Sequence, residues 1–414
     1  MTKIRLLVLL TTFLFVGSIG TLVFQYAKGF RFNQQTGEVT QNGILVIKSY
    51  PDGAEVFING ELKTGTNATI PLPPSTYDIS IRKEGFFSWE KRINIKNEEV
   101  TEATAHLFKL APSLSPLTFS GVQNVFASPD ISKISYTVPL SSNNNDSEGL
   151  WIIETINLPI GFSRDPRRIT DGNLDNSTWV WSPDAREILL TTSKGDYLLD
   201  TTAFTPQSQR VNIKAQKASI LKKWDEEKNK KLQAQIRKLP DEVEDVLTRK
   251  ASAVVLSPDE NMVLYTASSS ATIPENLIKA LPGSSTQDQE RDIKPGRTYV
   301  YDIKEDRNFL ISEEGAILTG WVDYKELIEI GNWKLEIGNS RRSLAWYPSS
   351  RHIIETVEEK VVIMDYDGTN SQTVYSGSYI APHAYPTVSL ERLLILTNLG
   401  ANSTPANLYS LNIK

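Results

Sequence analysis

The sequence predicts a mainly β protein with one membrane helix at its N-terminal end. Three observations lead to this class: an uncharged apolar run near the start, a segment whose apolar residues lie two apart, and a short pattern that recurs four times. A run of about 20 apolar residues suits a membrane helix, period-two spacing suits strands with one buried face, and recurrence marks a repeat architecture. With 414 residues, the chain is long enough for two or more folded units.

The apolar run spans Leu6 to Phe24 and follows Lys3 and Arg5. Cations on the short N-terminal side favour a cytoplasmic N-terminus and an exported body, so we expect residues 1–30 to form a single-pass anchor. A cleaved signal peptide is the alternative, since Ser18 and Gly20 are small residues that could precede a cleavage point. The anchor is preferred because the apolar run continues beyond that point.

The segment 43–110 is expected to be a small antiparallel β domain. It opens with a continuous apolar run, Ile44 to Ile47, which suits a strand covered on both sides, and Pro and Gly turns separate its later parts. The apolar pairs spaced two apart are Val56 and Ile58, Ile79 and Ile81, and Ile93 and Ile95.

The string SYPDGAEVFING in this segment resembles the PEGA domain, whose Pro-Glu-Gly-Ala motif stands here as Pro51 to Ala54 with Asp52 in place of Glu. The likeness includes the Asn59-Gly60 turn, Tyr77 and Gly85-Phe86. It implies an accessory module of envelope proteins that lies outside the membrane and has no activity of its own.

The recurring pattern is anchored on Pro129, Pro183, Pro258 and Pro348, with an apolar residue five positions later and a threonine eight positions later. Each copy is followed by a second strand candidate, and a turn, a strand, a polar turn and a strand in succession are typical of propeller blades. A fifth, degenerate copy can be aligned at Ser389. The second strand candidates are Leu150 to Ile153, Tyr197 to Leu199, Tyr299 to Ile303, Val361 to Met364 and Asn407 to Leu411.

The Ser-Pro-Asp form of these copies, together with Met364 to Thr369, resembles the blades of TolB-type propellers, which are related to the tryptophan-aspartate repeat family. We therefore expect residues 114–414 to form a TolB-like β-propeller of about six blades, with five or seven left open. The weakest stretch is Gly320 to Ser340, where IEIGN and LEIGN suit two strands of a poor blade or a local duplication.

Residues 209–250 are dense in Lys, Glu and Asp and are expected to form a helical hairpin inserted in the propeller. Its apolar stripe either packs back on the propeller or on the other helix, or serves as a partner-docking arm anchored by Trp224. The stripe consists of Ile213, Ile220, Trp224, Leu232, Ile236 and Leu239, followed by Val243, Val246 and Leu247. Ser268 to Pro295 reads as a second insertion, a surface loop with a short helix.

No catalytic signature stands out. The serine elbow G-x-S-x-G and a glycine-rich phosphate loop are absent, and His106, His352 and His383 form no metal-binding pair. Asp365 to Gly368 superficially resembles a calcium loop but lacks the third acidic position and the distal glutamate, so we expect a hairpin turn. No catalytic residue, cofactor or metal site is therefore expected.

The amino-acid composition limits the classes of partner and of site that we expect. The 44 basic and 49 acidic residues give a net charge of -5 without a basic patch, so nucleic acid is not expected. Zero cysteines exclude disulfides, thiolate metal sites and a lipid-modified cysteine.

The favoured hypothesis is a membrane-anchored, non-catalytic envelope protein whose propeller binds a protein, peptide or cell-wall glycan. The rival is an envelope hydrolase or lyase that acts through the propeller mouth, and a third is a structural spacer. The sequence does not identify the ligand or the oligomeric state.

Overall fold

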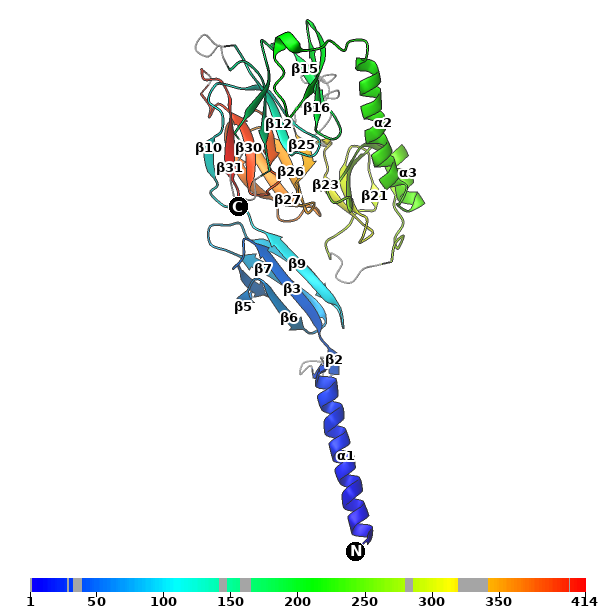
Figure 1. The fold of residues 1–414 in the computed structure, drawn as a ribbon. Coiled ribbons are helices and arrows are strands. Elements are labelled where there is room, and N and C mark those ends of the chain that lie inside the picture. Colours follow the sequence, from blue (N-terminus) through cyan, green and yellow to red (C-terminus); the bar gives the residue numbers. More distant parts are fainter. Residues whose placement is uncertain are drawn as a thin grey trace. The chain divides into compact units, whose positions relative to one another are not determined.

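The computed structural model describes residues 2–27, 30–32, 39–140, 147–156, 165–279, 286–318, 342–401 and 403–414. They divide into two compact units, the first containing residues 1–107 with 280–287 and the second containing 108–279 with 288–414. Strands dominate both units, in agreement with the predicted fold class (Figure 1).

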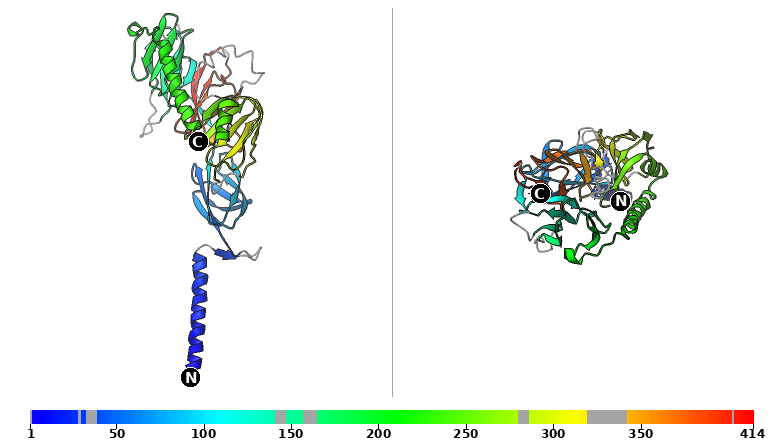
Figure 2. Two further views of the ribbon diagram at one scale, coloured as in Figure 1. Left: turned by 90° about the vertical axis from the view of Figure 1, so that its right-hand side faces the viewer. Right: turned by 90° about the horizontal axis from the view of Figure 1, so that it is seen from above.

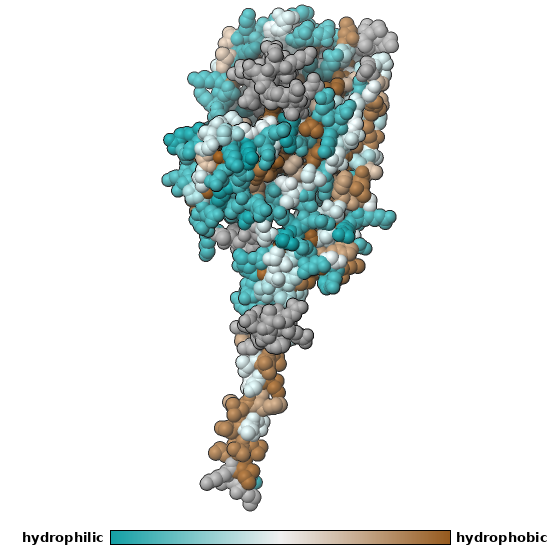
Figure 3. All heavy atoms as spheres, turned by 180° about the vertical axis from the view of Figure 1, so that it is seen from behind, coloured by the Kyte–Doolittle hydropathy of each residue, from teal (hydrophilic) through white to brown (hydrophobic). Residues whose placement is uncertain are grey.

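The first unit begins with helix α1 (Thr2–Ala27), whose segment Ile4–Phe24 has a mean hydropathy of 2.3 and is not buried in the protein. Apolar side chains cover this helix (Figure 3). Its hydroxyl groups bond to backbone carbonyls about one turn back, which satisfies them without water. Length and composition allow α1 to cross a membrane, although a signal sequence has the same properties. The self-satisfied hydroxyls are those of Thr11, Thr12, Ser18 and Thr21.

After the short pair β1 (Phe30–Phe32) and β2 (Val39–Gln41), two sheets form around one core. One has the order β6-β3-β9 and the other β5-β4-β7-β8. Their bounds are β3 (Gly43–Tyr50), β4 (Glu55–Ile58), β5 (Glu61–Gly65), β6 (Ala68–Leu72), β7 (Ser75–Arg82), β8 (Trp89–Ile95) and β9 (Val100–His106). The three predicted pairs of apolar residues are all buried in this core, because side chains two apart on a strand share one face.

Two expectations for this domain are wrong. The run Ile44 to Ile47 is not covered on both sides, since Leu45 and Ile47 are fully buried but Ile44 is 39% exposed. Each sheet buries only the face turned to the other sheet, so β3 obeys the same alternation as its neighbours. In addition, β3 pairs with β9 in parallel, so the domain is mixed rather than antiparallel.

The second unit is a series of sheets that correspond to propeller blades, and their strands are antiparallel except where β24 (Ile317–Leu318) pairs with β25 (Ser343–Trp346) in parallel. The first blade is β11 (Gln123–Ala127), β12 (Lys133–Val138), β13 (Gly149–Glu154) and β14 (Arg167–Asp171), and the second is β15 (Thr178–Trp181), β16 (Glu187–Thr192) and β17 (Gly195–Asp200). The third is β18 (Ala251–Leu256), β19 (Met262–Ala267), β22 (Thr298–Asp302) and β23 (Arg307–Ser312), with β20 (Ala271–Thr272) and β21 (Asp292–Ile293) paired beside it. The fourth is β25 (Ser343–Trp346), β26 (His352–Val357), β27 (Lys360–Asp365) and β28 (Gln372–Ser376), extended by β24 (Ile317–Leu318).

The last sheet, which we call the closing blade, joins the two ends of the unit. Its order is β10 (Ser113–Pro116), β31 (Asn407–Asn412), β30 (Arg392–Thr397) and β29 (Ala384–Pro386). The blades lie side by side around a common centre (Figure 2). The described residues form five blades, and the total of six stays a prediction because Gly320 to Ser340 lies outside them. All five predicted second strands are confirmed, as β13, β17, β22, β27 and β31.

Between the second and third blades the chain forms a short 3-10 helix (Gln207–Gln209), α2 (Lys217–Ile236) and α3 (Asp241–Arg249). Ile236, Leu239, Val243 and Leu247 pack against Tyr265, Tyr299 and Tyr301 of the third blade. This C-terminal part of the apolar stripe therefore faces the propeller rather than solvent.

Candidate binding surface

The repeated Ser-Pro-Asp turns are structural. The buried Ser257 hydroxyl donates to Asp259 at 2.7 Å and accepts the Met262 amide at 3.0 Å, which closes the turn between β18 and β19. Ser128 with Asp130 and Ser182 with Asp184 repeat this geometry in the first two blades. Because this buried hydroxyl both donates and accepts a hydrogen bond within the turn, its role is to stabilise the turn.

The degenerate fifth copy starts one residue earlier than predicted. The Thr387 amide bonds the Arg392 carbonyl as the Ser128 amide bonds that of Lys133, so Val388, not Ser389, occupies the proline position. Two positions after Val388, Leu390 has a φ of 64°, and the equivalent residues of the other copies have similar positive φ values. These are Ile131, Ala185, Glu260 and Ser350, at 53° to 58°. Sequence offsets alone could not detect this shift, because Leu393 to Ile395 is apolar in either register.

These turns connect the blades to one another at the end of the sheets that we call the turn end. Lys133 donates from the first blade to the Ala185 carbonyl of the second at 2.8 Å. The Asp259 amide donates to Ser350, and Tyr347 donates to the Leu390 carbonyl, at 3.0 and 2.7 Å. The turn end is thus occupied by contacts that hold the propeller together.

We call the opposite end of the sheets the loop end. Because neighbouring strands within a blade are antiparallel, this end holds the loop between the second and third strands of each blade and the loop that leads to the next blade. Here Phe119 is 80%, Leu140 54%, Ile380 44% and Leu399 57% exposed. Exposed apolar side chains on neighbouring loops are typical of interaction surfaces. We name these four residues the loop-end surface. No sequence motif had marked them.

His383 lies beneath this surface with its ring fixed by a hydrogen bond. Its Nδ1 lies 2.7 Å from the Tyr385 hydroxyl, which donates to the Val125 carbonyl at 2.8 Å. Since a carbonyl has no proton to give and the hydroxyl has only one, Nδ1 must be the protonated nitrogen, and Nε2 keeps a lone pair. Burial lowers the pKa of His383 to about 4, so the ring is neutral at pH 7.

Trp224, the predicted docking residue, lies in the middle of α2 and is 7% exposed. The helix is fixed near both ends: Lys217 pairs with Asp196 of the second blade at 2.7 Å, and Lys231 with Glu260 of the third at 3.4 Å. With α2 in this position, the Trp224 side chain is buried and is not available to contact a partner. A docking role for it stays a prediction.

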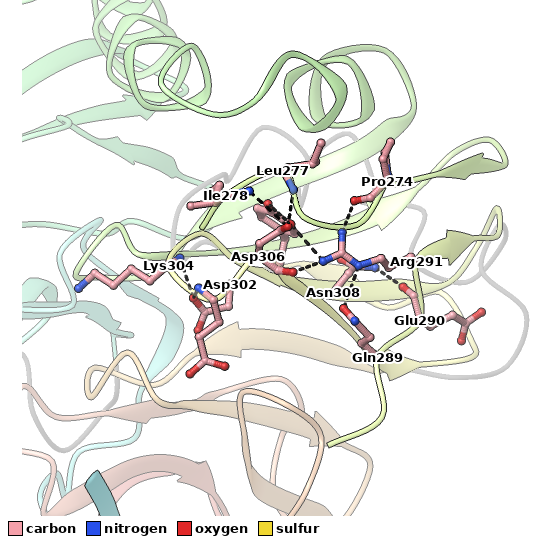
Figure 4. A network of polar contacts seen from close by, with 12 residues as sticks. Pro274, Leu277, Ile278, Gln289, Glu290, Arg291, Asp302, Lys304, Asp306 and Asn308 are labelled. Carbon is pink, nitrogen blue, oxygen red and sulfur yellow. Dashed lines mark hydrogen bonds and ion pairs between the residues drawn. The ribbon is translucent and has the colours of Figure 1, made fainter. Parts of the chain in front are cut away.

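The second insertion is fastened along the outer strand of the third blade (Figure 4). Asp306 accepts the Leu277 amide at 2.8 Å and the Tyr301 hydroxyl at 2.9 Å, and it pairs with Arg291 at 3.1 Å. Arg291 also donates to the Pro274 carbonyl. Burial, followed by the nearby Asp306 carboxylate, raises the pKa of Tyr301. A buried carboxylate with this many donors fixes the loop and needs no ligand.

One arrangement invites a catalytic interpretation. Ser349 Oγ lies 2.7 Å from His352 Nδ1, and His352 Nε2 lies 3.5 Å from Asp365 Oδ1. However, His352 is 3% exposed and packs edge-on against Phe108. Ser349 also occupies the position that aspartate holds in the other turns and accepts the Arg351 amide. The trio is therefore a variant of the turn.

The other candidates are also structural where the structure describes them. The segment Asp365 to Gly368 begins the turn from β27 to β28, in which Asp367 accepts the Thr369 hydroxyl at 2.6 Å. Within the described residues no group of three His, Cys, Asp or Glu side chains could hold a metal ion. His106, in the first unit, stacks on Tyr50 with the two ring centroids 5.1 Å apart.

Comparison with known proteins identifies one part of the chain. Residues 42–110 match the PEGA domain, which agrees with the predicted module at 43–110. The remaining residues lie outside this match. No curated protein matches the chain.

Three solved structures are similar to the chain over much of its length. A protein assigned as TolB from Agrobacterium tumefaciens is 12% identical, with 70% of this chain and 78% of that one covered and a TM-score of 0.23. TolB from Acinetobacter baumannii is 13% identical, covering 81% and 59%, with a TM-score of 0.18. An auxiliary nutrient binding protein from Bacteroides thetaiotaomicron is 9% identical, covering 87% and 78%, with a TM-score of 0.20. At these TM-scores the likenesses carry no argument about function.

Proposed function

We propose that this protein is a membrane-anchored envelope protein whose propeller binds a protein, peptide or cell-wall glycan outside the membrane, without catalysing a reaction. The observation that carries the proposal is the difference between the two ends of the blades. Neighbouring turns of the turn end bond to one another and, where the structure describes them, expose only Ile156 and Val388 among the large apolar residues of the repeat turns and their flanks, whereas the loop end exposes Phe119, Leu140, Ile380 and Leu399. A rigid scaffold that presents exposed loops is suited to recognition.

Anchoring through α1 belongs to the same proposal. The N-terminus is cytoplasmic, α1 is retained, and the PEGA domain and propeller are outside, since Lys3 and Arg5 precede the apolar segment. Intact mass of the protein from its native membrane will include residues 1–30, and protease added outside will digest the propeller. A mature chain that starts near Gly20 would contradict the anchor.

The test of binding places a photo-crosslinking amino acid at Leu140 in the full chain and identifies what is captured in the native envelope. Val211, which is 74% exposed in the segment before α2, is the matched control position. A single partner captured from position 140 but not from 211 is the expected result. Equal capture at both positions would contradict a loop-end site.

The rival hydrolase is tested separately. A fluorophosphonate probe labels activated serines, and we expect no labelling of Ser349 because His352 is buried against Phe108. Labelling of the wild-type chain that Ser349→Ala abolishes, together with turnover of a cell-wall polymer, would replace the binding proposal by the enzyme.

A further inference from the structure

The closing blade and its flanks carry almost no charge. Residues 111–129, 368–390 and 393–413 contain no Asp, Glu, Lys or Arg, although these types make up 22% of the chain. At that share the 63 residues would carry about 14 charged side chains. The three stretches are far apart in sequence, and together they supply β10, β11, β28, β29, β31 and nearly all of β30. The fold therefore gathers them into one neutral region.

Hydrogen bonds join three loops of this region at the loop end. The Gly121 amide donates to the Asn407 side chain at 3.1 Å, which joins loop 117–122 to loop 398–406. Thr397 donates to the Ser378 carbonyl at 2.6 Å, which joins loop 377–383 to the same place. Each loop exposes one large apolar residue: Phe119 at 80%, Ile380 at 44% and Leu399 at 57%. We call these three residues the neutral patch.

We infer that the neutral patch is a contact surface for a second copy of this chain. A two-fold symmetric contact brings a surface against itself, so any excess of one charge on it would repel its own copy. The three patch loops carry no charge and meet this condition, and the exposed Glu358, Glu359 and Lys360 lie in an adjoining turn, whose Glu359 carbonyl accepts the Gly377 amide. The chain as a whole, at a net charge of -5, repels other copies. A different protein partner would ordinarily be guided by complementary charge, and the patch offers none.

Membrane anchoring strengthens this choice. A helix such as α1 confines neighbouring copies to the same plane, which raises their effective concentration, so a small apolar patch is enough for association. The inference rests on the proposed function, because Phe119, Ile380 and Leu399 also belong to the loop-end surface: it assigns these three residues to a second copy and leaves Leu140 to the partner. Capture at position 140 tests the partner, and cross-linking at positions 119 and 399 tests the second copy, so the two outcomes are distinguishable.

The absence of cysteine in the chain allows a direct test. Phe119→Cys, Leu399→Cys and Val211→Cys are made singly in the full chain, and native membranes are treated with a bismaleimide cross-linker. Val211 is 74% exposed and lies outside the neutral region, so it reports random collisions. We expect at least tenfold more cross-linked dimer from positions 119 and 399 than from 211.

A second change separates contact from collision. Ile380→Glu, added to Phe119→Cys, places a carboxylate on the patch without touching the core, and it should reduce the cross-linked dimer to the Val211→Cys level. Equal cross-linking at all three positions, or dimers that persist after Ile380→Glu, would overturn the inference. Cross-linking of position 119 only to a different protein would also overturn it.

Discussion

Removal of the Ser257 hydroxyl tests the central argument that the repeat is a structural device. In Ser257→Ala, Asp259 loses a donor at 2.7 Å and the buried Met262 amide loses its acceptor at 3.0 Å. A lost bond to a carboxylate and a buried unpaired amide each cost about 1–3 kcal/mol, and relaxation of the turn recovers part of it. We expect the free energy of unfolding to fall by about 2 kcal/mol.

The measurement is urea unfolding of the full chain in detergent, followed by tryptophan fluorescence. Ser193→Ala, at an exposed site in the turn from β16 to β17, is the control and should stay within about 0.5 kcal/mol of wild type. Because the same bonds recur, Ser128→Ala and Ser182→Ala should each resemble Ser257→Ala. If all three match the control, the turns do not hold the blades and the argument fails.

The loss of stability in Ser257→Ala should also depend on pH. Burial raises the pKa of Asp259, but hydrogen bonds from Asn261 and Ser257 outweigh it and leave the pKa below its usual value. The folded state therefore favours the carboxylate, and this stability is present above the unfolded pKa of about 3.9 and lost as the pH falls through the folded value. The difference between wild type and Ser257→Ala should accordingly shrink in acid. A difference that grows below pH 4 would contradict this account.

Three further predictions concern other sites. Asp306→Ala leaves Arg291 buried without its carboxylate, so it should destabilise the third blade by about 3–5 kcal/mol and speed limited proteolysis between residues 268 and 295; unchanged cleavage would refute the network. Trp224→Ala should lower the free energy of unfolding by about 3–5 kcal/mol because the side chain is buried, whereas loss of partner binding at unchanged stability would favour the docking arm. The low pKa of His383 means that the unfolded chain binds more protons between about pH 6.5 and 4, so stability should decrease by up to about 3 kcal/mol as the pH falls through that window, and His383→Gln should flatten the unfolding curve against pH.

Local patterns predicted the strands well. Val56 and Ile58 are buried together because period-two spacing places both on the inner face, and Pro183 lies in the turn before β16 because proline tolerates a turn better than a central strand. Asn59 and Gly60 both have positive φ, as a tight hairpin requires. These outcomes depend on a few neighbouring residues, so the sequence contains the necessary information.

Features that depend on distant residues could not be read in this way. The parallel pairing of β3 with β9 depends on two segments more than 50 residues apart, and the burial of Trp224 depends on where α2 is fixed by Asp196 and Glu260. The candidate surface was missed for the same reason. The loops that carry Phe119 and Leu399 are joined through Asn407, and no periodic pattern in the sequence links them.

The closing blade also imposes an order in time on the synthesis of the protein. β10 pairs with β31, and Ser115 bonds the Ser410 carbonyl across 295 residues of chain. As the chain emerges from the ribosome, β10 has to wait until the residues of β31 have followed. A chain cut off before Asn407 retains all five repeat turns but leaves β10 and β30 as two unpaired edges, which are targets for proteases and for aggregation. Pairing of β10 therefore reports that synthesis has passed the six residues of β31.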